Sequence, residues 1–440
     1  MPRCFSKNLI LFSLTIILSF STFSVFGQQS LEFAIPAETS TDSLQGQIDW
    51  PHGRLESWNG PVVLFISAAS PSDRDGWQVR ALETVWAERL PLKELSATLV
   101  KQGVAVIRFD NPGVLPPQKQ CRQSIFKKGL TERILWQRCL DLATVARFAP
   151  IRYWETIEHM LPQLQNLMPA IRNQLFLFGF SEGLMHAAAI ADRGGVRPQG
   201  FISLGSPAET LESTARWQAT DRITEALAEF DANADDVVTN EEIKKGYKNG
   251  INNFMNLEGW LSASGAWDSG NRGLLAKDMA LSYEQILRDY RDVSGAGTLY
   301  WVAQANGVKV PDMTDAIWHF YFYGQTSPAE VMQRLKIPGL FMWGDRDRQV
   351  AIDRQVRLLD KINREGGNLV YLRFPGRHHL LSKRKDFDWL EKEFMPEIAG
   401  KVAAFVRSGA RLPYSNADTD LVVKPEADSL SYENSSRKNR

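Results

Sequence analysis

The segment Gly179-Phe180-Ser181-Glu182-Gly183 has the residue types and spacing for nucleophilic chemistry, as a G-x-S-x-G motif. An apolar run at 174–178 precedes it, and a helical stretch at 184–193 follows it. Between a strand and a helix, this motif makes a sharp turn in which the glycines keep Cβ atoms out of the bend and the serine hydroxyl projects. We therefore predict that Ser181 is a nucleophile. A glycine-rich turn with a capping serine is the alternative.

A serine hydroxyl is a weak nucleophile and needs a general base, which an acid in turn orients. Downstream of Ser181, Asp345 and Asp347 follow one apolar run, and His378 and His379 follow the next. The order serine, acid, histidine is the one found with this strand–turn–helix motif. Both members of each pair remain open on this evidence. The other histidines are interpreted as structural or surface residues: His52, His159, His186 and His319.

With these motifs the sequence resembles the α/β-hydrolase family, over residues 61 to about 407. In that family an acid commonly closes a G-x-x-D segment, and the histidine usually stands in a P-G-x-x-H-like loop. The resemblance implies that Asp347 and His379 complete the site, with Asp345 and His378 as the alternatives. It also implies an α/β fold with a mostly parallel central sheet flanked by helices and an inserted helical cap. No organic cofactor is expected.

The resemblance further implies an oxyanion hole made of two backbone N–H groups. One belongs to Glu182, the residue after the nucleophile. The other is expected from Ala69, in the loop 67–76 that follows an apolar run. That loop is similar to the G-S-G-P-x-D-R-D-G loop of one group of bacterial α/β-hydrolases. It departs from the pattern at Ala68 and Ser70, where glycines are common.

Residues 231–242 resemble the calcium loop of an EF-hand, which places oxygen ligands at positions 1, 3, 5, 7, 9 and 12. The loop departs from the pattern at position 6, where Asp236 replaces the usual glycine. We predict a structural Ca²⁺ site, and a solvated acidic helix–loop–helix is the alternative. The predicted ligands are Asp231, Asn233, Asp235, the carbonyl of Val237, Thr239 and Glu242.

The first 27 residues have two basic side chains followed by an apolar run, which is typical of a cleaved signal peptide. We expect a secreted or periplasmic protein, with an uncleaved membrane anchor as the alternative. Cys4 would leave with the signal, so Cys121 and Cys139 remain in an oxidising compartment. A disulfide between them is predicted, and two separate buried thiols are the alternative.

Short apolar runs, mostly separated by helical stretches, predict a mostly parallel sheet. Their ranges are 61–67, 104–109, 174–178, 201–204, 339–343 and 368–374. The alternation stops over 208–336, which is helical in pattern and rich in aromatic residues, and we interpret this stretch as the cap. The hydrolase core then comprises 28–207 and 337–414, and the polar tail at 415–440 is predicted to be disordered.

The chain of 440 residues has 51 basic and 51 acidic side chains, so no basic field points to nucleic acid. The leading hypothesis is an exported serine hydrolase that cleaves small-molecule esters, with no membrane attachment after signal cleavage. A serine peptidase or aminopeptidase of the same fold is one alternative. A non-catalytic, calcium-dependent binding protein on a hydrolase scaffold is the other. The sequence leaves the oligomeric state open.

Overall fold

The computed structural model describes most of the predicted core and the beginning of the predicted cap. The described residues are 28–36, 43–67, 72–76, 90–115, 139–146, 150–219, 221–235, 237–248, 274–275, 327–383 and 389–409.

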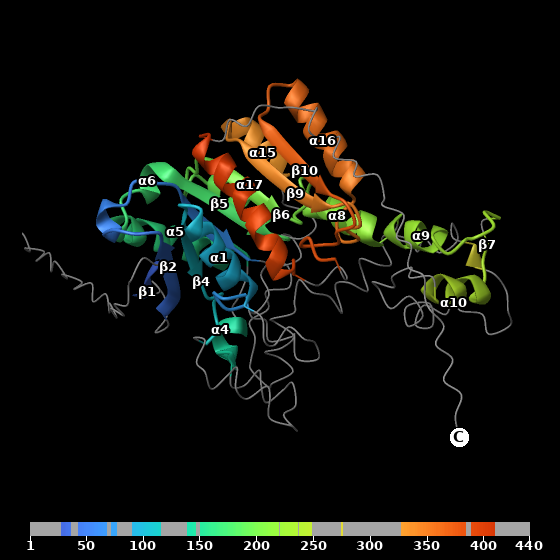
Figure 1. The fold of residues 1–440 in the computed structure, drawn as a ribbon, viewed down its shortest axis with the longest axis horizontal. Coiled ribbons are helices and arrows are strands. Elements are labelled where there is room, and N and C mark those ends of the chain that lie inside the picture. Colours follow the sequence, from blue (N-terminus) through green and yellow to red (C-terminus); the bar gives the residue numbers. More distant parts are fainter. Residues whose placement is uncertain are drawn as a thin grey trace, which may run out of the picture.

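A single eight-stranded sheet forms the centre of the molecule, in the order β1-β2-β4-β3-β5-β6-β9-β10 (Figure 1). Its strands are β1 (Gln29–Pro36), β2 (Ser43–Trp50), β3 (Val62–Ile66), β4 (Ala105–Phe109), β5 (Leu175–Phe180), β6 (Gly200–Leu204), β9 (Gly339–Gly344) and β10 (Leu369–Phe374). The pairs β1–β2 and β2–β4 are antiparallel, and all the other neighbours are parallel. The predicted fold class, a mostly parallel sheet flanked by helices, is therefore confirmed.

Helices cover both faces of this sheet, so every residue of β3, β4, β5, β6 and β9 is buried. On one face α1 (Pro91–Lys101) and α17 (Met395–Arg407) lie against each other and close one apolar core. The second core lies beneath α5 (Pro150–Leu167), α7 (Gly183–Asp192), α15 (Pro328–Leu335) and α16 (Ile352–Arg364). The shorter helices are η1 (Leu55–Ser57), α4 (Leu142–Ala146), α6 (Ile171–Gln174) and η6 (Lys392–Phe394).

The N-terminal strands β1 and β2 are absent from the strands predicted above. In β1 the buried side chains are Leu31, Phe33 and Ile35, which alternate with less buried ones. A strand covered on one face needs only every second residue to be apolar. This edge of the sheet therefore lacks the continuous apolar runs found in the central strands.

The predicted cap leaves the core after β6 and is described only in part. Its described elements are α8 (Leu211–Ala219), α9 (Asp221–Ala228), β7 (Val237–Val238), α10 (Asn240–Lys248) and β8 (Leu274–Leu275). Its two ends lie side by side, because the N–H of Ala329 donates to the carbonyl of Ala208 at 3.2 Å. Much of the predicted cap lies outside the described residues, so the domain boundaries stay predictions.

The predicted signal peptide, the predicted tail and Cys121 also lie outside the described residues. Cys139 is 1% exposed and is not a free thiol. Its predicted pairing with Cys121 stays a prediction. Among the described helices, none combines the length and hydropathy needed to cross a membrane.

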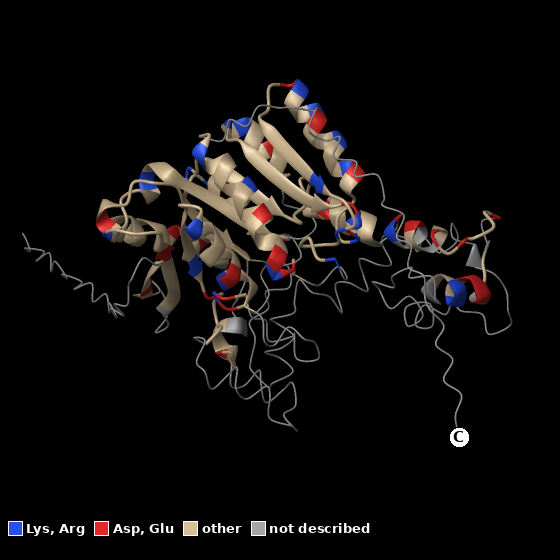
Figure 2. Cartoon of the chain, in the orientation of Figure 1, with Lys and Arg blue, Asp and Glu red and all other residues tan. Residues whose placement is uncertain are grey.

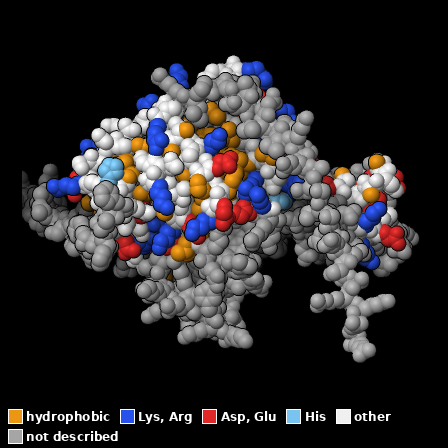
Figure 3. Space-filling model, viewed as in Figure 1, with side chains coloured by type: hydrophobic (Ala, Val, Ile, Leu, Met, Phe, Trp, Pro, Cys, Tyr) orange, Lys and Arg blue, Asp and Glu red, His pale blue; other side chains and the backbone are white. Residues whose placement is uncertain are grey.

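The surface of the described core carries charges of both signs on its helices and loops, whereas the strands are almost free of them (Figure 2). On the face seen in Figure 3, apolar side chains appear as small areas between charged ones. Among the described residues, one large apolar side chain is exposed, that of Leu115 at 39%. No broad apolar patch therefore marks a partner surface on this visible part of the described molecule.

Candidate active site

Ser181 lies in the tight turn between β5 and α7, with a backbone φ of 51°. A serine in this left-handed region is strained, and such strain persists only where the surroundings enforce it. A Cβ on Gly179 would lie 2.2 Å from the backbone nitrogen of Leu184, and one on Gly183 would lie 2.0 Å from the carbonyl oxygen of Ile66. Both flanking positions of the motif therefore require glycine.

The imidazole of His379 joins the serine to an aspartate. Its Nε2 lies 3.0 Å from Ser181 Oγ, and its Nδ1 lies 2.8 Å from Asp347 Oδ2. His379 is 4% exposed and Asp347 is 6% exposed. Three residues from three separate sheet-edge loops are thus brought into one hydrogen-bonded series.

The Asp347 carboxylate has a fixed orientation. Its Oδ1 accepts the backbone N–H groups of Gln349 at 2.7 Å and Val350 at 3.1 Å, while Oδ2 faces His379. An ionised carboxylate only accepts hydrogen bonds, so the facing Nδ1 of His379 carries the proton. In the neutral ring, Nε2 then presents its lone pair to the hydroxyl of Ser181.

The loop that carries Asp347 is also held by the predicted cap. Gln218 of α8 donates from Nε2 to the carbonyl of Gln349 at 2.7 Å. Arg222 of α9 donates to the carbonyl of Arg348 at 3.3 Å and to Gln349 Oε1 at 3.2 Å. The position of Asp347 therefore depends on the insertion as well as on the core.

The two alternative residues have other contacts. Asp345 is exposed, and its Oδ1 accepts the N–H of Gly376 at 2.8 Å, which braces the turn before the histidines. The N–H of His378 donates to the carbonyl of Ser382 at 2.7 Å. It is the ring of His379 that reaches Ser181.

An ion pair stabilises the loop that carries His378 and His379. Arg377 pairs with Glu391, donates to the carbonyl of Leu381 at 3.1 Å, and lies with its guanidinium 3.7 Å from the ring centre of Phe394. Glu391 also accepts the N–H of Lys383 at 2.9 Å. Burial alone would raise the pKa of Glu391, but these N–H donors and the arginine charge lower it.

The predicted oxyanion hole is described on one side only. Glu182 immediately follows Ser181 and caps α7, whereas Ala69 lies outside the described residues. At the start of the Ala69 loop, the Ser67 hydroxyl donates to Asn111 Oδ1 at 2.9 Å. The Tyr153 hydroxyl lies 3.4 Å from the carbonyl oxygen of Ser67.

Buried ion pairs hold the other end of the same loop. Arg74 makes a two-nitrogen contact with Asp110, at 3.1 and 2.6 Å to Oδ2. Arg108 pairs with Asp75 and reaches Asp49 Oδ2 at 2.9 Å. Burial raises the pKa of Asp110, although the hydrogen bonds and charge of Arg74 oppose that rise. Because these charged side chains are buried and paired, they hold residues 72–76 in a fixed position relative to the sheet.

His186, interpreted from the sequence as a structural or surface residue, is fully buried and is hydrogen-bonded to the residue after the nucleophile. Its Nε2 lies 3.0 Å from Glu182 Oε1, and its Nδ1 lies 3.0 Å from Trp154 Nε1. The signal available in the sequence was the i, i+4 spacing of Glu182 and His186 at the start of a helix.

The EF-hand-like loop lies between α9 and α10. The carboxylate of Glu242 accepts the N–H of Ala232 at 3.1 Å and that of Thr239 at 2.9 Å. The N–H of Asp235 donates to Asp231 Oδ1 at 3.2 Å and to Asn233 Oδ1 at 3.1 Å. The two segments of the loop are therefore tied together across its mouth.

Two further observations bear on the loop. Val237 and Val238 pair antiparallel with Leu275 and Leu274. Hydrogen bonds from Thr239 and Ala232 lower the pKa of Glu242 against the effect of its burial. In the described part of the chain, which omits Asp236, no three His, Cys, Asp or Glu side chains are grouped as metal ligands. The oxygen-rich residues suit a hard cation such as Ca²⁺, but binding would need these side chains to regroup.

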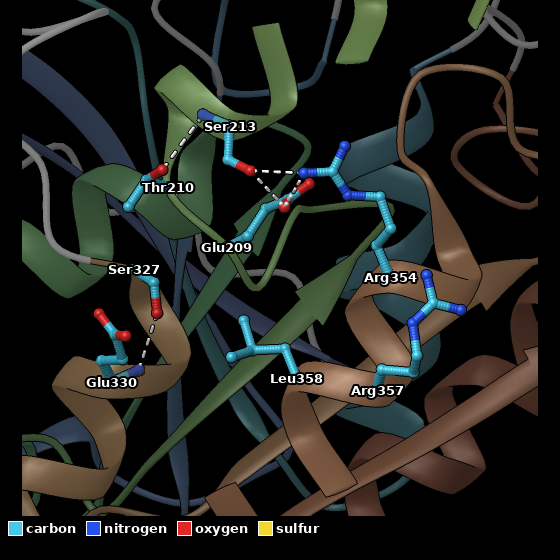
Figure 4. A pocket seen from close by; sticks show the side chains of 8 residues that line it. All are labelled: Glu209, Thr210, Ser213, Ser327, Glu330, Arg354, Arg357 and Leu358. Atoms are coloured by element: carbon cyan, nitrogen blue, oxygen red, sulfur yellow. Dashed lines mark hydrogen bonds and ion pairs between the residues drawn. The ribbon is translucent and has the colours of Figure 1, made fainter. Parts of the chain in front are cut away.

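A pocket of about 430 Å³ lies where the two ends of the insertion meet α16 (Figure 4). Glu209 is held there by Arg354 at 3.0 Å and by Gln355 at 2.7 Å, while Ser327 caps α15 through the N–H of Glu330. Ser181, Asp347 and His379 do not line this pocket. Its lining is Glu209, Thr210, Ser213, Ser327, Glu330, Arg354, Arg357 and Leu358.

Comparison with known proteins gives general likeness only. No family model and no curated protein sequence matches the chain. Among solved structures, a proline iminopeptidase of Mycobacterium smegmatis is 14% identical with a TM-score of 0.44, over 86% of this chain and 98% of that one. A lipase in its open form is 16% identical with a TM-score of 0.43, over 87% and 100% of the two chains.

A thermostable carboxyl esterase of Bacillus coagulans, solved with glycerol, is similar to the same extent. It is 14% identical with a TM-score of 0.39, over 88% of this chain and 100% of that one. Likenesses at these levels assign neither a family nor an activity, so function has to be inferred from the site itself.

Proposed function

We propose that the protein is an exported serine hydrolase that cleaves carboxylic esters through an acyl-enzyme. The observation that carries the proposal is the hydrogen-bonded series of Ser181, His379 and Asp347, with 3.0 Å and 2.8 Å between successive partners. The strained backbone of Ser181 supports it as well, because strain of this kind clusters at functional sites.

In the proposed first step, Ser181 Oγ attacks the ester carbonyl carbon while its proton passes to His379 Nε2. Asp347 keeps the ring oriented through Nδ1–H and stabilises the imidazolium that forms. The imidazolium then gives its proton to the leaving alkoxide, which departs as an alcohol. Water attacks the acyl-enzyme by the same route, releasing the acid and restoring the serine.

The negative charge on the carbonyl oxygen is proposed to be met by the N–H groups of Glu182 and Ala69. Each such donor contributes about 3–4 kcal/mol to the transition state in comparable sites. The buried ion pairs around residues 72–76 and the Ser67–Asn111 hydrogen bond support this role, since they hold both ends of the Ala69 loop.

A fluorophosphonate probe tests the proposal directly. Labelling should occur at Ser181 and should be lost in Ser181→Ala and His379→Ala, whereas His378→Ala serves as the matched control and should keep labelling. Nitrophenyl esters and aminoacyl nitroanilides then separate the esterase from the peptidase alternative. A folded protein that takes no label and cleaves neither class would instead support the non-catalytic binding protein.

We also propose that Ca²⁺ binds the loop 231–242 and stabilises the insertion without taking part in the chemistry. The spacing of the oxygen-bearing residues between two helices supports this, as does the short ribbon of β7 and β8 beside them. Asp231, Asp235 and Glu242 repel one another, so a cation would relieve that cost. A single loop without glycine at position 6 should bind weakly, at about 10⁻⁴–10⁻³ M.

The calcium proposal is tested by thermal unfolding with calcium and with chelator. Millimolar calcium should raise the melting temperature of the wild type, and Glu242→Gln should abolish most of that rise. Glu241→Gln, one residue away and outside the predicted ligand set, is the matched control. An unchanged wild-type melting temperature, together with no heat of binding at millimolar calcium, would mean that the loop is only an acidic turn.

A further inference from the structure

The side chain of His186 contacts Glu182, the residue that follows the nucleophile in the turn. It lies one helical turn after Glu182 on α7, has no exposed surface, and is bonded on both ring nitrogens. Trp154 of α5 provides one partner and the carboxylate of Glu182 provides the other. An imidazole held in this way has neither rotational freedom nor access to solvent.

The chemistry of the two partners fixes the tautomer of His186. The indole Nε1–H of Trp154 can only donate, so the facing Nδ1 must be the unprotonated acceptor. The neutral ring then carries its proton on Nε2, which donates to Glu182 Oε1 at 3.0 Å. Trp154 thus orients His186, and His186 in turn orients the Glu182 carboxylate.

The same helix also contacts Ser67, at the start of the loop that contains the other predicted donor. Tyr153, next to Trp154, lies with its hydroxyl 3.4 Å from the Ser67 carbonyl and with its ring edge-on to His186 at 5.1 Å. Burial raises the pKa of Tyr153, and the nearby charge of Glu182 adds to that rise. His186 therefore contacts both the Glu182 carboxylate and the ring of Tyr153.

We propose that His186 is a positioning residue for the hydrolysis proposed above, on which this inference rests. By donating to Glu182, it holds the carboxylate away from the oxygen that the N–H of Glu182 is proposed to stabilise. A carboxylate released at this position would place a second negative charge near that oxygen and oppose catalysis. His186 thereby makes an acidic residue tolerable directly after the nucleophile.

The test is a kinetic cycle with His186→Ala, Glu182→Gln and the double variant. His186→Ala should lower kcat by roughly 10–100-fold with KM nearly unchanged, which is the scale of one lost charge-assisted hydrogen bond. Glu182→Gln alone should cost little, since its amide oxygen still accepts from His186. The double variant should recover most of the kcat lost in His186→Ala, because the stranded charge is then gone.

His159→Ala on α5 is the matched control, since that side chain bonds to the neighbouring Gln163 and to the carbonyl of Pro36 in β1. If His186→Ala folds poorly, His186→Gln, which keeps one donor and one acceptor, should retain activity within about threefold. A kcat loss that persists in the double variant would mean a packing void, and would overturn the inference.

The two proposals fail differently. A folded wild type that neither reacts with fluorophosphonate nor cleaves ester refutes the proposed hydrolysis, and this inference with it. A reactive wild type whose His186→Ala variant keeps its kcat refutes the role of His186 alone.

Discussion

Replacing Asp347 with asparagine should inactivate the enzyme while leaving its shape intact. In the structure, Oδ1 accepts two backbone N–H groups, from Gln349 and Val350, and Oδ2 accepts Nδ1–H of His379. An asparagine must keep its carbonyl toward the two N–H groups, because its NH₂ placed there would leave both donors unsatisfied, at about 1–3 kcal/mol each. The NH₂ then points at His379.

Facing an N–H donor, Nδ1 of His379 has to become the acceptor, and the ring proton moves to Nε2. Nε2 lies 3.0 Å from Ser181 Oγ, where it is needed as a base and would now offer a proton instead. Such a reversed tautomer lowers kcat by about 10⁴-fold, which corresponds to about 5.5 kcal/mol of transition-state stabilisation. The melting temperature should change little, since the side-chain volume and the two backbone hydrogen bonds are retained.

The assay is steady-state ester hydrolysis together with the rate of fluorophosphonate labelling. Asp345→Asn is the matched control, because an asparagine oxygen there still accepts the N–H of Gly376, and its activity should stay within about threefold of wild type. If Asp347→Asn keeps more than about a tenth of the activity, the tautomer of His379 does not depend on Asp347 as described. If Asp345→Asn is the more damaging change, Asp345 rather than Asp347 orients the histidine.

Three other predictions follow from single contacts. Gly183→Ala should prevent formation of the turn, because its Cβ would lie 2.0 Å from a carbonyl oxygen, whereas Gly400→Ala, with nothing within 4 Å, should fold normally by circular dichroism. Glu391→Gln should lower stability by about 1 kcal/mol at pH 7; because the folded pKa of Glu391 is lowered below 4.5, urea titrations should show that the difference disappears as the pH falls through that folded pKa. Thiol titration of the denatured, unreduced mature protein should find no free thiol at Cys121 or Cys139, and two reactive thiols would contradict the disulfide.

The sheet could be predicted where its strands are buried on both faces. All the predicted runs correspond to strands in the structure, from β3 (Val62–Ile66) to β10 (Leu369–Phe374), with ends that differ by at most two residues. The runs of β3, β4, β5, β6 and β9 are continuous because helices cover both faces. The edge strand β10 is only partly buried, but its sequence LVYLRF is still largely apolar. β1 and β2 were missed because an edge covered on one face leaves only an alternating pattern, in which Gln45 and Gln47 interrupt the apolar residues.

Motif spacing located the residues around Ser181, but it left two choices that only tertiary structure resolves. Asp345 and Asp347 are two residues apart and both follow β9, and the direction of each side chain depends on the turn that joins β9 to α16. The contacts of His186 could not be predicted for a related reason. Its partner Trp154 lies 32 residues earlier in the chain, and no local pattern records that contact.

The insertion between β6 and α15 begins and ends at neighbouring points, since Ala329 N lies 3.2 Å from the carbonyl of Ala208. Chain of very different length can be looped out between two such points, at a cost of only about 0.6 kcal/mol for each doubling. Inserts of different length can therefore be accommodated at this point while the sheet and the serine turn keep their geometry. The insert is nevertheless constrained, because Gln218 and Arg222 hydrogen-bond to the segment that follows Asp347. A grafted insert that lacks equivalents of these two side chains would have to hold the acid in some other way.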